Sequence, residues 1–135
     1  MKRKNINASD VKGNNINISD SEWKVMKALW EKPGLTLRGI AAELAGTGWS
    51  YTTVRTMVSR LVEKGAVSAD KTDPNSFLYS PAVLESECKA KEMDSFLTRV
   101  FDGSVSMLIS TLTRDRGLTE EEQKELMSII EKIES

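Results

Sequence analysis

The chain of 135 residues contains no histidine and a single cysteine, Cys88. One cysteine cannot form an intrachain disulfide, and a chain without histidine has no Ser-His or Cys-His nucleophile pair and no His-containing zinc site. No phosphate-binding loop is present either. The sequence therefore predicts neither enzymatic activity nor a bound metal or cofactor, and Cys88 is interpreted as a small apolar residue.

The sequence also lacks long apolar runs, since none approaches the ~18 residues that suggest a membrane span. The first ten residues, MKRKNINASD, carry basic side chains without the apolar segment of a secretory signal. With 29% charged and 39% hydrophobic residues, the composition is typical of a soluble globular protein, so we expect a cytoplasmic location and no membrane partner. Residues 1–17 are rich in asparagine without helical or strand periodicity, and we expect a disordered arm there.

Charge is unevenly distributed, although the formal net charge is only −1. Residues 1–80 hold 12 Lys and Arg against 8 Asp and Glu, whereas residues 81–135 hold 7 against 12. A polyanionic partner is therefore expected to meet the N-terminal part of the chain.

The N-terminal part begins with helix signals. A first helix is predicted to begin after Ser19, because Glu22 three residues later completes a capping box. Lys32-Pro33-Gly34 (residues 32–34) ends this helix. A second helix is predicted over residues 37–45, after a short extended piece at Leu35.

A third helix is predicted from Ser50 to Gly65, joined to the second by a glycine-bearing turn as in a helix-turn-helix. A β-hairpin follows in residues 66–80, because Asp-Pro-Asn at residues 73–75 is strong turn chemistry. Three helices followed by a two-stranded hairpin make a winged helix-turn-helix. Residues 18–81 are therefore expected to form a DNA-binding domain.

The third helix, SYTTVRTMVSRLVEKG in residues 50–65, has two different faces. At 100° per residue its apolar side chains gather on one side and are expected in the core. The other side carries hydroxyls and two arginines, which suit base edges, thymine methyls and phosphates in a major groove. With one lysine of the predicted wing, the candidate DNA-contacting residues are Tyr51, Thr52, Thr53, Arg55, Thr56, Ser59, Arg60 and Lys71.

Two alternatives remain open for this helix. Its polar side is either a DNA-reading face or an ordinary polar surface, since helix-turn-helix patterns in short sequences give false positives. The hairpin favours the first alternative, because a wing with Lys71 beside its turn is placed to touch an adjacent DNA backbone or minor groove. Tyr51 either contacts a phosphate through its hydroxyl or packs under the turn.

The remaining residues, 82–135, are predicted to be helical over 82–101, 104–114 and 120–134. About 50 residues of amphipathic helix have little of their own to pack against, so we expect a C2 dimer. The alternative is a monomer whose helices fold back on the winged domain. The predicted dimerisation residues are Leu84, Phe96, Leu97, Val100, Phe101, Leu108, Ile109, Leu112, Leu126, Ile130 and Ile133.

Three segments carry a family resemblance: ISDSEWKVMKALW, SYTTVRTMVSRLVEKG and the hairpin end FLYSP. In order and spacing they resemble the penicillinase repressor and methicillin-resistance repressor family, which also includes copper-responsive repressors. The resemblance implies a winged-helix dimeric repressor that binds dyad operator sites in double-stranded DNA and blocks transcription. It also implies DNA contacts at Thr52, Thr53, Arg55 and Thr56.

The chain departs from this family pattern in two places. Copper-responsive members have paired cysteines near the C-terminus, and this chain has none there, so a copper or zinc switch is not expected. In the antibiotic-responsive branch, inactivation involves cleavage of an Asn-Phe bond in the dimerisation region. By spacing, the corresponding bond here joins Thr111 and Leu112, so the resemblance implies a cleavage position for an inducing protease but not the same protease or signal.

The sequence thus predicts a mostly α-helical protein with a small β-hairpin, made of a winged helix-turn-helix domain and a C-terminal helical dimerisation region. Its expected function is transcriptional repression by a homodimer bound to a dyad operator, with antibiotic-resistance-type genes as candidate targets. The alternative is a winged-helix protein–protein interaction module without specific DNA binding. A DNA titration over a salt series distinguishes the two.

Overall fold

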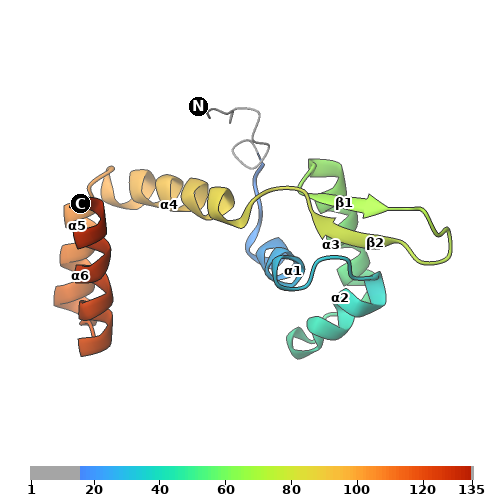
Figure 1. The fold of residues 1–135 in the computed structure, drawn as a ribbon, viewed down its shortest axis with the longest axis horizontal. Coiled ribbons are helices and arrows are strands. Elements are labelled where there is room, and N and C mark those ends of the chain that lie inside the picture. The colour runs from blue at the N-terminus through green and yellow to red at the C-terminus, as the bar shows by residue number, and fades with distance from the viewer. Residues whose placement is uncertain (1–15, 135) are drawn as a thin grey trace. The chain divides into compact units, whose positions relative to one another are not determined.

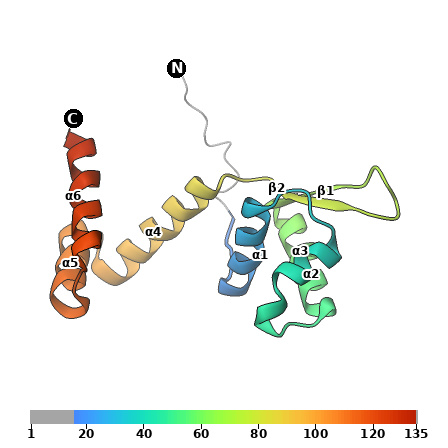
Figure 2. The same cartoon turned by 60° about the horizontal axis from the view of Figure 1, so that its bottom comes forward.

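The computed structural model describes residues 16–134, with side-chain environments through residue 132. Most of the predicted N-terminal arm, residues 1–15, lies outside the described residues. The chain divides into two compact units, Met1–Lys91 and Glu92–Ser135, whose helices and strands are shown in Figures 1 and 2. Within the described residues, no helix is both long enough and apolar enough to cross a membrane.

The first unit contains the predicted three helices and hairpin (Figure 1). In chain order its elements are α1 (Asp20–Glu31), α2 (Leu37–Glu43), the short 3-10 helix η3 (Ala45–Thr47), α3 (Tyr51–Lys64), β1 (Val67–Asp70), β2 (Leu78–Pro81) and the first turns of α4 (Glu85–Phe101). This arrangement confirms the predicted winged helix-turn-helix. Helix α2 ends earlier than predicted, because the chain tightens into η3 before Gly48, whose φ of 79° favours glycine.

The core of this unit is built from one side of each of its three N-terminal helices. Their spacing of three and four residues places the apolar side chains on a single face per helix. Cys88 is buried in the same core, as predicted, and burial raises the pKa of its thiol. The largest fully buried side chains are Val25, Met26, Leu29, Ile40, Val54, Val58 and Leu61.

The hairpin is tied to the helices by a third extended segment. Strands β1 and β2 pair antiparallel, with Val67 opposite Pro81 and Ala69 opposite Tyr79. Leu35, between α1 and α2, forms an antiparallel bridge to Tyr79. The Tyr79 N–H donates to the Leu35 carbonyl at 2.8 Å, and the Leu35 N–H donates back at 3.1 Å. The base of the wing is therefore fixed to the α1–α2 connection.

Helix α4 begins later than predicted. The sequence placed its start at residue 82, whereas the structure starts the helix at Glu85. The Trp30 indole N–H donates to the Val83 carbonyl at 3.1 Å, which holds this stretch against α1 in a non-helical conformation. Val83 is itself buried. The predicted start at residue 82 is therefore wrong, because a long-range hydrogen bond competes with the helix.

Residues 16 and 17 pack with the first unit, although the sequence placed them in the arm. Ile16 is 8% exposed and belongs to the core. The carbonyl of Ile16 accepts a hydrogen bond from Lys91, and the carbonyl of Asn17 accepts one from Lys64. A lone isoleucine in an asparagine-rich segment has no periodic apolar neighbours, so its burial leaves no signal in the sequence.

Glu22 is the only buried charged residue in the described part of the chain, at 3% exposed. Its Oε1 accepts hydrogen bonds from the Ser19 N–H at 3.0 Å and from Lys64 Nζ at 2.6 Å. The Glu22 N–H donates to Ser19 Oγ, which completes the predicted capping box. Burial raises the pKa of Glu22, but the hydrogen bonds and charge of its partners outweigh burial and hold that pKa below its ordinary value.

The second unit is mainly helical. Its elements are the remainder of α4, α5 (Val105–Thr111), the π-helix η4 (Leu112–Arg116) and α6 (Glu120–Glu134). The predicted helix over residues 104–114 thus changes from α to π geometry after Thr111. Thr119 and Glu122 form a reciprocal capping box at the start of α6. None of residues 92–132 is buried, so the described part of this unit has no closed core of its own.

We predict that Glu22→Gln lowers the free energy of unfolding by ~1–3 kcal/mol at neutral pH, since glutamine removes the charge that Lys64 and the Ser19 N–H stabilise. Lys64 is 35% exposed, so solvent screens part of the interaction. Because the folded pKa of Glu22 is depressed, its contribution is complete above the unfolded pKa and is lost as pH falls through the folded pKa. Urea denaturation followed by tryptophan fluorescence over a pH series measures the difference.

Glu31→Gln is the matched control, because Glu31 is exposed on the same helix. We expect it to change stability by less than ~0.5 kcal/mol. An equal loss in both variants, or a Glu22→Gln effect that grows towards acid, would contradict the prediction.

Candidate nucleic-acid interface

Capping hydrogen bonds are present at both ends of helix α3. Ser50 is extended, and its Oγ accepts a hydrogen bond from the Thr53 N–H at 3.1 Å. At the other end Gly65 adopts a φ of 87°, and its N–H bonds to the carbonyls of Leu61 and Val62. These limits agree with the predicted ones.

The two sides of α3 separate as the periodicity predicted. The buried residues are Val54, Met57, Val58 and Leu61. Every α3 residue predicted to contact DNA is exposed. Six of them form two neighbouring rows, because residues four apart lie one above the other on a helix. We call these rows, Tyr51-Arg55-Ser59 and Thr52-Thr56-Arg60, the α3 face.

The α3 face carries two arginines, Arg55 and Arg60. Within the described part of the chain, neither Arg55 nor Arg60 takes part in an ion pair. The first turn of α3 contains no acidic residue. Thr53, beside the face, differs in that its Oγ1 accepts a hydrogen bond from Ser50 Oγ at 3.1 Å. The α3 face therefore presents two unpaired positive charges among hydroxyl groups.

One row of the α3 face borders a hollow of about 480 Å³. The start of α2 and the hairpin turn at residues 74–77 form its other walls. The guanidinium carbon of Arg38, on α2, lies 5.9 Å from the centre of the Tyr51 ring. Tyr51 is 45% exposed, so it lies in the open beside Arg38 and is not packed in the core. Arg38 was missed in the sequence because only the packing of α2 on α3 brings it to this site.

The other row of the α3 face borders a second hollow, of about 410 Å³. The N-terminal turn of α1, including Ser19 and Ser21, forms the opposite wall. Trp49 also lines it, and this half-buried ring packs against the core. Lys24 Nζ lies 5.6 Å from the centre of the Trp49 ring. The exposed rows of α3 therefore have a hollow on each side.

Lys71 lies on the wing, directly after β1. It is exposed at the end of β1, and its Nζ lies 5.6 Å from the centre of the Phe77 ring. It borders neither hollow. Asn75 and Ser76 of the hairpin turn line the first hollow instead. The sequence identified the turn but not these two residues, because the direction of turn side chains depends on how the hairpin packs.

The predicted dimerisation residues differ in exposure. Leu84 is exposed and precedes α4, and Val100 is exposed on α4 itself. The side-chain environment of Ile133 lies outside the described residues. Met93, Val105, Met107 and Met127 are also exposed apolar residues, and they are not among the predicted dimerisation residues. The half-buried members are Phe96, Leu97, Phe101, Leu108, Ile109, Leu112, Leu126 and Ile130.

The proposed cleavage position lies in helical backbone. Thr111 has φ and ψ of −64° and −42°, and Leu112 has −61° and −43°. The bond between them falls where α5 passes into the π-helix η4. Both side chains are half-buried. The bond is therefore not in an exposed loop, where proteolysis is concentrated.

A family model described as penicillinase repressor matches residues 18–132. This chain belongs to the penicillinase repressor family. The penicillinase repressor of Bacillus licheniformis is 34% identical over 115 residues, which cover 84% of this chain and 89% of that protein. The methicillin resistance regulatory protein MecI of Staphylococcus aureus (strain N315) is 33% identical over 116 residues, which cover 85% and 94%.

Among solved structures, the monomeric form of Bacillus licheniformis BlaI in complex with the blaP half-operator is 38% identical. The match covers 53% of this chain and 87% of that chain, with a TM-score of 0.46.

Membership of the penicillinase repressor family confirms the resemblance seen in the sequence. The family consists of transcriptional repressors and not of enzymes, in agreement with the prediction. The whole α3 face lies within the matched range, whereas residues 16 and 17 precede it.

Proposed function

We propose that this member of the penicillinase repressor family represses transcription by placing its α3 face in the major groove of an operator. The observation that carries this proposal is the pair of unpaired arginines, Arg55 and Arg60, set among hydroxyls on a helix with a hollow on each side. A polyanion supplies the negative charge that the described part of the protein does not offer these side chains.

The dimensions and chemistry of the α3 face suit a major groove. An α-helix with its side chains is ~10–12 Å wide, and the groove is ~12 Å wide. Arginine donates two parallel hydrogen bonds to a guanine edge or a phosphate, and threonine offers a hydroxyl and a methyl group. The two hollows leave room for the sugar–phosphate strands that flank the groove. Arg38 and the hairpin turn are then positioned for backbone contacts, which orient the protein without reading sequence.

The proposed repressor is a homodimer. Support comes from the second unit, in which no residue between 92 and 132 is buried and Val100, Val105, Met107 and Ile129 are exposed. Amphipathic helices without a closed core are stabilised when a second copy covers their apolar sides. A two-fold dimer matches a dyad operator, and occupancy of that operator denies polymerase access to the promoter.

We predict that Arg55→Ala and Arg60→Ala each weaken binding to operator DNA by about 10- to 100-fold, or ~1–3 kcal/mol. If the lost contact is to a phosphate, the slope of log affinity against log salt should fall by ~1. Fluorescence anisotropy with a footprinted fragment from upstream of the protein's own gene, over a salt series, measures both quantities.

Arg99→Ala is the matched control, since Arg99 is an exposed arginine on α4 that hydrogen-bonds only to Ser95 Oγ and forms no ion pair among the described residues. Unchanged affinity in both α3 variants would rule out their assignment as DNA contacts. If the wild-type protein binds no DNA at any salt concentration, the protein–protein interaction alternative would replace the repressor proposal.

We predict that the wild-type protein is a dimer at micromolar concentration and that Val100→Asp shifts it towards monomer. Aspartate places a charge where an exposed apolar residue is expected to be covered by a second copy. Sedimentation velocity measures the proportions of monomer and dimer. Thr98→Asp is the control, since Thr98 is exposed on the same helix but on a different side. A monomeric wild-type protein would refute the dimer.

We also propose that an inducing protease cuts the chain between Thr111 and Leu112. The irregular α-to-π junction at this bond supports local unwinding, which a bond in helical backbone requires before cleavage. Mass spectrometry of the protein from derepressed cells is expected to find fragments ending at Thr111 and beginning at Leu112. A chain that stays intact while its target gene is expressed would count against proteolysis.

A further inference from the structure

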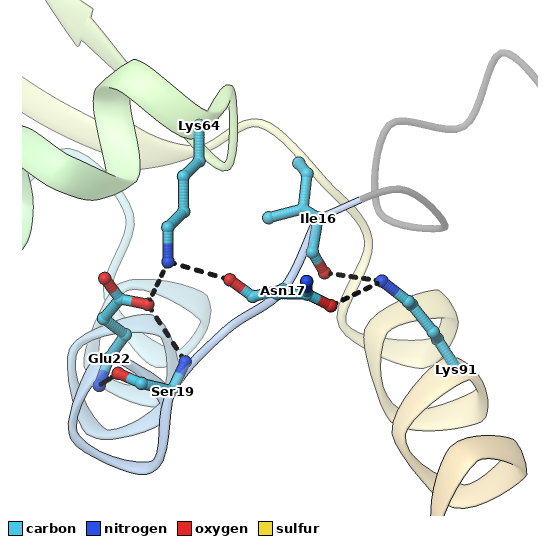
Figure 3. Close-up of polar contacts among 6 residues, drawn as sticks. All are labelled: Ile16, Asn17, Ser19, Glu22, Lys64 and Lys91. Atoms are coloured by element: carbon cyan, nitrogen blue, oxygen red, sulfur yellow. Dashed lines mark hydrogen bonds and ion pairs between the residues drawn. The ribbon is translucent and has the colours of Figure 1, made fainter.

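The two residues before Ile18, Ile16 and Asn17, bridge elements that are far apart in the sequence (Figure 3). We call these two residues the strap. The side chain of Ile16 is buried in the core of the first unit. This burial anchors the strap beside α1 and leaves its polar oxygens available to two lysines.

Lys91 of α4 holds the strap from one side. Its Nζ donates to the Ile16 carbonyl at 2.9 Å and to Asn17 Oδ1 at 3.3 Å. Lys64, the last residue of α3, holds the strap from the other side by donating to the Asn17 carbonyl at 2.8 Å. Figure 3 shows the two ammonium groups on opposite sides of Asn17. The strap therefore connects the end of α3 with α4 through charge-assisted hydrogen bonds, which are stronger than neutral ones.

The part of α4 held by the strap is short. Lys91 is the last residue of the first unit, and α4 continues without interruption to Phe101. Within the first unit, residues 85–91 are otherwise fixed by the burial of Cys88 and by the neighbouring bond from Trp30 to the Val83 carbonyl. The bonds from Lys91 to the strap therefore hold α4 at the last residue of the first unit.

We propose that the strap and Lys91 are positioning residues that fix the first two turns of α4 on the winged domain and so set the half-site spacing that the dimer accepts. This proposal rests on the proposed function, in which α3 reads a half-site and the second unit dimerises. The gain from occupying a second half-site depends on the stiffness of the connection between the two reading heads. A loosened start of α4 should lower affinity for the best spacing and widen the range of tolerated spacings.

The strap also precedes the segment matched by the family model, which begins at residue 18. The positions that interact with it, Lys64 and Lys91, lie inside that segment. The strap therefore lies immediately before the matched segment and is held by lysines on two of that segment's helices.

The test compares one-site and two-site DNA binding by the full-length Lys91→Met variant. Methionine keeps the length of the side chain but cannot donate to the Ile16 carbonyl or to Asn17. The probes are a duplex with one half-site selected from a random-sequence pool, and duplexes with two inverted copies whose centres are ~10 bp apart or displaced from that spacing by about 1 or 2 bp. Lys89→Met is the matched control, because Lys89 lies on the same turns and pairs only with Glu85 among the described residues.

We expect Lys91→Met to bind the single half-site within about twofold of the wild type, while its affinity for the best two-site duplex falls by about five- to tenfold. The affinities of Lys91→Met for duplexes with different half-site spacings should also differ less than those of the wild type. Lys91→Arg should restore both properties, because arginine can donate to the same two oxygens. Deuterium exchange of the amides in residues 85–91 should accelerate in the methionine variant and return to the wild-type rate in the arginine variant.

Unchanged two-site affinity and unchanged spacing preference in Lys91→Met would overturn the positioning role. An equal loss on one-site and two-site duplexes would also overturn it, because a general loss of stability or of DNA contact predicts that pattern. If Lys91→Met is poorly folded, the test uses Lys91→Arg instead. An altered spacing preference in Lys91→Arg, with amide exchange of residues 85–91 equal to that of the wild type, would then refute the proposal. Failure of the wild type to bind the single half-site would instead refute the proposed function, so the two failures are distinguishable.

Discussion

Helix α3 can bury only one of its sides, and the first unit is arranged around that constraint. Val54, Val58 and Leu61 are almost completely buried, and each such aliphatic side chain contributes ~1.5–3 kcal/mol relative to exposure. A rotation that buried Arg55 or Arg60 instead would lose this contribution and would desolvate a charge. Core packing and the avoidance of charge burial therefore specify the same orientation of α3.

The ends of α3 are stabilised by polar interactions that its core contacts do not supply. Lys64 is shared between the Glu22 carboxylate and the Asn17 carbonyl. Glu22 is at the same time the capping partner of Ser19. One buried carboxylate thus joins the start of α1 to the end of α3, and the strap extends the network to Lys91. Such a network is stabilising because each buried polar group in it has a partner.

The second unit differs from the first in that its helices form without a buried core in the described residues. Its helices have well-formed local signals, such as the capping box of Thr119 and Glu122, yet none of residues 92–132 is buried. Local signals fix where helices begin, whereas burial needs a second apolar surface. Membership of the penicillinase repressor family and the exposed apolar side chains together make a second copy of this chain the partner we propose.

The sequence by itself determined the element order, the capping box at Ser19, the limits of α3 and the separation of its two sides. These features depend on residues three or four positions apart, whose interactions are local to one helix. Only the tertiary structure decided the burial of Ile16, the place of Arg38 beside Tyr51, the delayed start of α4 and which residues of the wing border the first hollow. Each of these depends on contacts between distant parts of the chain, which neither periodicity nor capping chemistry encodes.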